Sequence, residues 1–488
     1  KMPENNKGSR IIVTTRIETV ANAYSPASVS GPYIHKMEPL KLDDSKKLFV
    51  SEVMVSKSLE ANFLSLHGGR YKGMLYDKIR RLSIHTAVEG VDSIAMINVE
   101  GRQGEDNLNM EHVRSLSMFH LQGHKLLKKL GNFILLRVLD LEDCEGVTNK
   151  HVRYACNLYL LRYLSLRRTN VSKVPRQIQN LEHLQTLNLD MTLLTWLPKT
   201  ITKLEKLEYI LFSNKNDYWE TMWTLPRGIK KMKSLRVLRM VHLGNDTKVA
   251  QELGELEQLL ELDLSIDNSK TIDEDILKEI ALSISKMHSL RSLWIGLHGS
   301  SDDGSKIPNF LHHLPTPPRL LRTLWIRGDI VNGFPCWIRS LTHLVSFNAW
   351  HTTLSDDELF GVLCMLPNLK TLYVTWNCYR GDELVVRSSH KFPVLRDLIL
   401  GGYLPKVLRF EEGSMAMLGM LKLGFDSRSR HVAEGTIVGI EHLTNLKKIT
   451  LQCFGDNSAL INPVLEQLKA ENDRLSRSNS QFQILVKY

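Results

Sequence analysis

Apolar residues recur along most of the chain at positions i, i+3 and i+5, in short segments separated by polar residues. Typical segments are Leu136-Arg-Val-Leu139-Asp-Leu141 and Leu161-Arg-Tyr-Leu164-Ser-Leu166. Residues i+3 and i+5 of an extended strand point to the same side, so each segment predicts a short strand with two residues facing a core. A weaker segment begins at Ile79, and fourteen clear ones begin at Val113, Leu136, Leu161, Leu184, Leu207, Leu235, Leu259, Leu290, Leu321, Leu344, Leu369, Leu395, Leu418 and Leu446.

From Val113 onward, the interval between successive segments lies between 23 and 31 residues. Intervals of this size are typical of the leucine-rich repeat. A single repeat cannot bury its apolar face alone, so repeats must stack on one another. We therefore expect an α/β fold, a leucine-rich-repeat solenoid in which the strands form one curved parallel sheet, in the shape of a horseshoe.

Proline marks the return path between several strands. Because proline lacks an amide hydrogen and has a fixed φ, it suits the start of a helical turn. After the last repeat, Asn462-Pro463 predicts the start of a helix and residues 482–486 predict a strand, which together would cap the array. The prolines that predict helical turns opposite the sheet are Pro175, Pro198, Pro226 and Pro335.

The alternation also predicts which side chains face away from the core. Trp294, Trp325, Trp350 and Tyr373 fall at outward positions of neighbouring strands. Large aromatic residues that lie together on a sheet surface are typical of a protein-binding site. We expect Arg327 and Asn348 to supply polar contacts there. The alternatives are that the inserted loops around residues 299–318 cover these rings, or that the rings belong to the core.

The composition fits a folded chain that is not an enzyme. Of 488 residues, 43% are apolar and 24% are charged, which excludes a disordered protein. The net charge of +10 is spread along the chain, which disfavours a nucleic-acid partner. We find neither a metal-binding cysteine pair nor a catalytic motif. No apolar run reaches the length of about 18 residues that spans a membrane, so we expect a cytoplasmic protein.

The first residues differ from the repeats. Residues 8–16, Gly-Ser-Arg-Ile-Ile-Val-Thr-Thr-Arg, predict a polar turn, a buried strand, and Thr14, Thr15 and Arg16 at the carboxyl end of that strand. In an open α/β sheet, ligands bind at this end of the strands. An arginine in this place suits a terminal phosphate, and the threonine hydroxyls would support it.

Several segments resemble plant disease-resistance proteins of the nucleotide-binding leucine-rich-repeat family. Residues 8–16 resemble the motif after the Walker B strand of the family, and residues 37–49 are similar to its next motif. Residues 79–85 and 112–117 resemble the start of the repeat domain in cereal members that carry an amino-terminal coiled coil. The resemblance implies an intracellular immune receptor whose repeats bind a protein. It also implies that Arg16, beside Thr14 and Thr15, senses the terminal phosphate of ATP.

The chain also departs from this family. It has no Walker A loop, and only 27 residues separate Phe49 from Asp77, too few for the subdomains that the family has there. We therefore interpret residues 1–66 as the remnant of a nucleotide-binding (NB-ARC) domain with a degenerate ADP/ATP switch that retains no nucleotide. The remaining parts would be a junction with an irregular repeat (67–110), the leucine-rich-repeat domain (111–460) and a cap (461–488).

The partner implied by the resemblance is a protein: a pathogen effector, a guarded host protein, or the switch domain of the receptor itself. A membrane would be contacted only peripherally. The alternative function is a non-enzymatic leucine-rich-repeat scaffold, such as a substrate adaptor of a ubiquitin ligase. A working nucleotide-hydrolysing switch is disfavoured because the phosphate-binding loop is missing.

Overall fold

The computed structural model describes the repeats and the carboxyl-terminal end of the chain. The described residues are 63–67, 80–85, 111–119, 125–217, 221–267, 273–298, 306–307, 311–312, 314–330, 333–402, 404–426, 436–454, 461–476 and 481–487. The chain divides into two compact units, Lys1–Asn62 and Phe63–Tyr488, and all described residues belong to the second. The predicted remnant of a nucleotide-binding domain, with Thr14, Thr15 and Arg16, lies outside the described residues apart from its last few positions.

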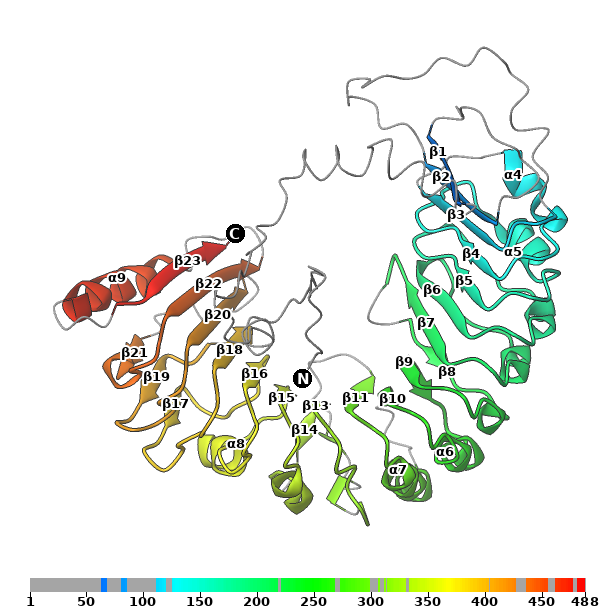
Figure 1. Ribbon diagram of the computed structural model, residues 1–488. Coiled ribbons are helices and arrows are strands. Elements are labelled where there is room, and N and C mark those ends of the chain that lie inside the picture. Colours follow the sequence, from blue (N-terminus) through cyan, green and yellow to red (C-terminus); the bar gives the residue numbers. More distant parts are fainter. Residues whose placement is uncertain are drawn as a thin grey trace, which may run out of the picture. The chain divides into compact units, whose positions relative to one another are not determined.

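One long parallel sheet organises the described part of the chain (Figure 1). Each strand pairs with the strand of the next repeat, and all fourteen clear segments form strands, as predicted. The weaker segment at Ile79 also forms one. In spatial order the sheet contains β1 (Phe63–His67), β2 (Arg81–His85), β3 (Ser115–Phe119), β4 (Val138–Asp140), β5 (Tyr163–Ser165), β6 (Thr186–Thr192), β7 (Tyr209–Asn214), β9 (Val237–Leu243), β10 (Glu261–Asp267), β11 (Ser292–His298), β13 (Thr323–Arg327), β15 (Ser346–Trp350), β16 (Thr371–Thr375), β18 (Asp397–Gly402), β20 (Met420–Asp426), β22 (Lys448–Phe454) and β23 (Gln483–Lys487), with the short β8 (Trp223–Thr224) beside β9.

The strand β1 was not expected in the repeats. It pairs in parallel with β2, so the division of the chain falls between Asn62 and Phe63 rather than after residue 66. Leu64 and Leu66 occupy the i+3 and i+5 positions of this segment, but position i is the small residue Ala61, and for this reason the periodic pattern is weak here.

The core lies between the sheet and the return segments. In β13, Leu324 and Ile326 are each 1% exposed, and in β15 Phe347 and Ala349 are fully buried. The same alternation recurs from repeat to repeat, because the paired register places equivalent leucines side by side. Removal of this apolar surface from water is the main force that holds the stack together.

The return segments contain 3₁₀ turns and α-helices on the side opposite the sheet (Figure 1). Pro175, Pro198 and Pro335 directly precede 3₁₀ turns as predicted, whereas the turn after Pro226 has Gly228 as its N-cap, with a φ of 94°. The 3₁₀ turns are η2 (Leu130–Asn132), η3 (Arg176–Asn180), η4 (Lys199–Lys203), η5 (Ile229–Lys231), η7 (Cys336–Ser340) and η8 (Ile440–His442), and the helices are α4 (Lys125–Lys128), α5 (Asn149–Ala155), α6 (Thr247–Leu253), α7 (Glu274–Lys286), α8 (Asp356–Leu363) and α9 (Asn462–Ser476).

A second, smaller sheet lies in the return segments of three consecutive repeats. It contains β17 (Glu383–Val386), β19 (Val407–Phe410) and β21 (Thr436–Val438), all parallel. A two-stranded pair, β12 (Lys306–Ile307) and β14 (Asp329–Ile330), also lies outside the long sheet. These strands were not predicted, because they are short and do not carry the i, i+3, i+5 spacing of apolar residues.

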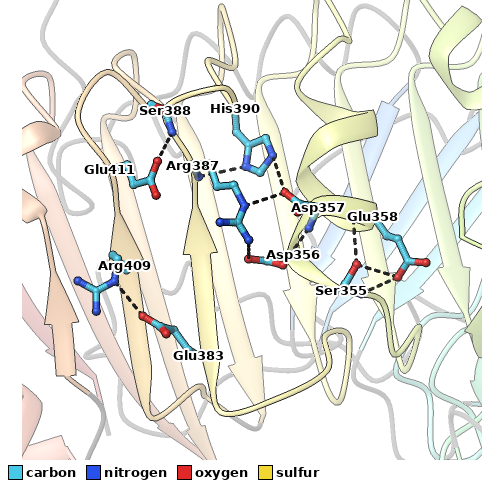
Figure 2. A network of polar contacts seen from close by, with 10 residues as sticks. All are labelled: Ser355, Asp356, Asp357, Glu358, Glu383, Arg387, Ser388, His390, Arg409 and Glu411. Atoms are coloured by element: carbon cyan, nitrogen blue, oxygen red, sulfur yellow. Dashed lines mark hydrogen bonds and ion pairs between the residues drawn. The ribbon is translucent and has the colours of Figure 1, made fainter.

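A polar network joins α8 to the second sheet (Figure 2). Ser355 and Glu358 form a capping box at the start of α8, and the guanidinium of Arg387 donates to Asp356 at 3.1 Å and to Asp357 at 2.8 Å. His390 is 4% exposed and accepts the amide hydrogen of Arg387, and burial lowers its pKa, which favours the neutral ring. The network holds α8, which follows β15 in the chain, against the segment that follows β17.

The cap consists of α9 and β23, as the sequence predicts. β23 pairs in parallel with β22 and ends the long sheet. The side chain of Gln467 in α9 pairs with the backbone of Ile437 in β21: its carbonyl oxygen accepts from the amide at 3.1 Å, and its amide donates to the carbonyl at 2.7 Å. Gln467 therefore satisfies the free edge of the second sheet at this residue.

Candidate protein-recognition surface

The predicted binding residues lie together on four adjacent strands of the long sheet. Trp294 of β11, Trp325 of β13, Asn348 of β15 and Tyr373 of β16 are direct partners in successive strand pairings. In the next row along the strands, Arg327 pairs with Trp350. This is the register that the alternation predicts. We call the six residues, Trp294, Trp325, Arg327, Asn348, Trp350 and Tyr373, the aromatic face.

Two rings of the aromatic face meet across Asn348. The centroids of Trp325 and Tyr373 are 6.2 Å apart, although their strands are separated by β15. Asn348, between them, is only 5% exposed, and its side-chain oxygen has no hydrogen-bond partner. The expectation that Asn348 offers polar contacts at the surface is therefore corrected: large neighbours on both sides bury it, although its strand position points outward.

Trp294 and Arg327 pack around a glycine. A Cβ atom added at Gly296 would lie 2.7 Å from Cη2 of Trp294 and 3.0 Å from Cβ of Arg327. The indole of Trp294 therefore leans along its own strand over Gly296, a position that a larger residue would block. This arrangement holds Trp294 beside Arg327 and fixes both side chains before any partner arrives.

Arg327 is a half-buried cation without a carboxylate partner among the described residues. Its guanidinium carbon lies 4.9 Å from the ring centroid of Trp350, a distance typical of a cation–π contact. Burial lowers the pKa of the guanidinium, which stays charged at neutral pH. Arg327 thus offers hydrogen-bond donors that no described acidic side chain uses.

Asp263 of β10 extends the row on the other side of Trp294, and sequence reasoning did not select it as a site residue. It is the direct strand partner of Trp294. Burial raises the pKa of its carboxyl group to about 6, and one of its oxygens has no hydrogen-bond partner. The signal that could have identified it is an acidic residue at the outward position next to the aromatic residues.

The described part of the chain contains no cluster of three or more His, Cys, Asp or Glu side chains suited to a metal ion. All six cysteines are free thiols. Among the helices that the structure describes, none is both long and apolar enough to cross a membrane. Thr14, Thr15 and Arg16, the residues predicted to contact a nucleotide, fall in the first unit and are not described.

The repeated strand-and-return units define a leucine-rich-repeat protein. A family model described as a leucine-rich repeat region matches residues 112–474. The match covers most of the chain, and the chain therefore belongs to the leucine-rich-repeat family.

Within this family, relatives of the chain are disease resistance proteins of rice, Oryza sativa subsp. japonica. Disease resistance protein Pik-2 is 28% identical over 475 residues, which cover 87% of this chain and 44% of Pik-2. Disease resistance protein RGA5 is 30% identical over 369 residues, which cover 72% of this chain and 31% of RGA5. These similarities confirm the predicted resemblance to plant disease-resistance proteins. The chain spans less than half the length of either relative.

Solved structures that are similar to this chain have lower sequence identity. A leucine-rich-repeat protein of Leptospira interrogans is 22% identical, with a TM-score of 0.47, over 73% of this chain and 89% of that chain. An internalin of Listeria monocytogenes is 18% identical, with a TM-score of 0.40, over 71% of this chain and 82% of that chain.

Proposed function

We propose that this chain serves plant defence as a recognition module, in which the aromatic face binds a protein partner. The observation that carries the proposal is the gathering of three tryptophans, a tyrosine and Arg327, which has no carboxylate partner among the described residues, on adjacent strands. Tryptophan, tyrosine and arginine are the residue types that contribute most of the binding energy at protein interfaces. The disease resistance proteins among its relatives support a role in plant defence.

The proposed role is that of an intracellular immune-receptor-like protein in the cytoplasm, and it is not enzymatic. Its partner is a pathogen effector, a guarded host protein, or the switch domain of the receptor itself. The aromatic face suits each of these, because its rings offer a large apolar area and lose little side-chain entropy on binding.

Affinity capture from leaf extract tests this role. We expect the chain to retain at least one plant protein that the Tyr373→Ala variant no longer retains. The matched control is Tyr159→Ala, because Tyr159 is 58% exposed and lies before β5, away from the aromatic face. Equal capture by both variants would contradict recognition through the aromatic face. Recovery of ubiquitin-ligase subunits would favour the adaptor alternative.

The finer part of the proposal concerns the nucleotide switch. We infer that Thr14, Thr15 and Arg16 belong to a degenerate ADP/ATP site, because the sequence has no Walker A loop to hold the phosphates. We expect that the purified chain, once denatured, releases no stoichiometric ADP or ATP, as measured by mass spectrometry. Release of one nucleotide per chain would show that the switch retains a working site.

A further inference from the structure

The residues that directly precede the strands form a row along the amino-terminal edge of the long sheet. From β11 to β22 most residues of this row are basic. The backbone aligns this row, because the amide of each residue donates to the carbonyl of its equivalent in the preceding repeat. Arg322 donates to Arg291 at 2.7 Å, and Arg396 donates to Lys370 at 2.8 Å. From β11 to β22 the aligned residues are Arg291, Arg322, Val345, Lys370, Arg396, Gly419 and Lys447. We call the five basic residues, Arg291, Arg322, Lys370, Arg396 and Lys447, the basic edge.

All five side chains of the basic edge are exposed, and none forms an ion pair with another described residue. An equivalent residue of an earlier repeat, Arg236, differs: its guanidinium lies 3.2 Å from the carboxylate of Glu208. Arg114, Arg137 and Arg162 of the first repeats are likewise exposed and form no ion pair with a described residue. The basic edge is separated from them in the row by Gln185, Glu208, Arg236 and Leu260.

The surroundings of the basic edge are almost free of acidic residues. In each of the seven repeats, the residue of the row follows the first leucine of the repeat segment. The two residues before that leucine, such as His288-Ser289 and Thr342-His343, include no Asp or Glu in any of the seven repeats. Among the first three outward positions of these seven strands, the only acidic residue is Asp397, whereas Arg327, Lys422 and Lys448 are basic. Charge that the sequence spreads over more than 150 residues is therefore concentrated on one surface.

Equally charged side chains on adjacent strands repel one another, because parallel strands are separated by only about 4.8 Å. Without internal counter-charges, such a row attracts and orients an oppositely charged molecule. The basic edge lies in the same repeats as the aromatic face, so one partner can contact both.

We propose that the basic edge binds an acidic polypeptide segment of the protein that the aromatic face recognises. This inference rests on the proposed function and names the chemistry of its partner. A segment that follows the edge from Arg291 to Lys447 crosses six strand spacings, or about 29 Å, which an extended chain of about nine residues covers. Carboxylates on such a segment would meet the five cations without displacing an internal ion pair.

The rings of the aromatic face favour a polypeptide over a single-stranded nucleic acid. Bases bind such proteins by stacking on open aromatic faces. Here one face of Trp350 holds Arg327, Trp294 leans over Gly296, and the rings of Trp325 and Tyr373 are inclined by 31° to each other. The rings thus present a packed apolar surface, which suits an apolar side chain beside the acidic segment.

Fluorescence anisotropy with the full chain tests the proposal on defined probes. The first probe is a labelled oligoglutamate peptide, the second is the same peptide with a central tryptophan, and the third is an oligoglutamine peptide. We expect the two glutamate peptides to bind with an affinity that falls as salt is added, and the glutamine peptide not to bind. Replacement of three edge residues, in the variant Arg291→Gln/Arg322→Gln/Lys370→Gln, should weaken binding of both glutamate peptides about tenfold.

The matched control removes the same charges from the helical side of the repeats. Arg153→Gln/Arg176→Gln/Lys199→Gln replaces exposed residues that form no ion pair with described residues, and it should leave the affinity within about twofold. An equal loss in both triple variants would overturn the proposal, since net charge alone would then explain binding. Tighter binding of an oligodeoxythymidine than of either glutamate peptide, or no binding of the glutamate peptides, would also overturn it.

The two glutamate peptides, without and with the central tryptophan, separate this inference from the proposed function. Trp325→Ala should weaken only the peptide with the central tryptophan, whereas the edge variant should weaken both peptides. If Trp325→Ala has no effect on either peptide while the edge variant does, the basic edge stands and the aromatic face fails. If the edge variant has no effect while Trp325→Ala weakens binding, the aromatic face is supported and the basic edge is overturned.

Discussion

Replacement of Gly439 by alanine is expected to lower the free energy of unfolding of the repeat domain by about 3 kcal/mol or more. Gly439 precedes η8 with a φ of 83°, a conformation that costs other residues about 1–2 kcal/mol. In addition, the new Cβ atom would overlap the backbone carbonyl oxygen of Phe410 in β19. A backbone atom cannot rotate away as a side chain can, so the second sheet must distort. Urea unfolding followed by circular dichroism measures the loss.

Gly413 provides the control for this prediction. It has nearly the same backbone conformation, with a φ of 80°, but no atom lies within 4 Å of the position of an added Cβ. Gly413→Ala should therefore cost only the backbone strain, about 1 kcal/mol. If the two variants are equally stable, then close packing of η8 against β19 is not what requires glycine at residue 439.

Trp325→Ala should weaken the binding of the protein partner by about 2 kcal/mol, or roughly thirtyfold in Kd. Trp325 is central in the aromatic face, where it contacts Tyr373 and covers Asn348. Folding should be retained, because the buried residues of the same strand, Leu324 and Ile326, are unchanged. Calorimetric titration with the partner recovered from leaf extract gives the affinity, and circular dichroism verifies the fold.

The matched control is Trp196→Ala. Trp196 is 51% exposed and lies in the return segment before η4, so its loss removes an indole without changing the aromatic face. Binding should stay within about twofold of the original affinity. Unfolding of the Trp325→Ala variant would show instead that this ring belongs to the core, and equal weakening by both variants would argue against a local site.

The sequence predicts the long sheet because one physical requirement repeats. Each repeat must place two apolar residues, such as Leu139 and Leu141, against the same core. The spacing of apolar residues therefore predicts both the strand and its register. The outward placement of Trp325 and Tyr373 follows from the same alternation. The cap is predictable as well, since Asn462-Pro463 marks the start of α9.

Other features depend on neighbours that the local sequence does not reveal. Glu383–Val386 becomes a strand only because β19 lies beside it one repeat later. Asn348 is outward by its position in the strand, but rings from both neighbouring strands bury it. The basic edge is invisible in the linear charge pattern, because Arg291 and Arg322 are 31 residues apart in sequence and adjacent in the fold.

The pairing of Gln467 with Ile437 has a consequence for association between copies of the chain. β21 is the last strand of its sheet, and an unsatisfied last strand is a template on which another molecule can add a strand. The side-chain amide of Gln467 pairs with both the backbone amide hydrogen and the backbone carbonyl oxygen of Ile437. In this way α9 blocks the addition of a strand at this residue. The variant Gln467→Leu would keep α9 but leave the backbone groups of Ile437 open, and we expect it to self-associate through this strand more readily than the original chain.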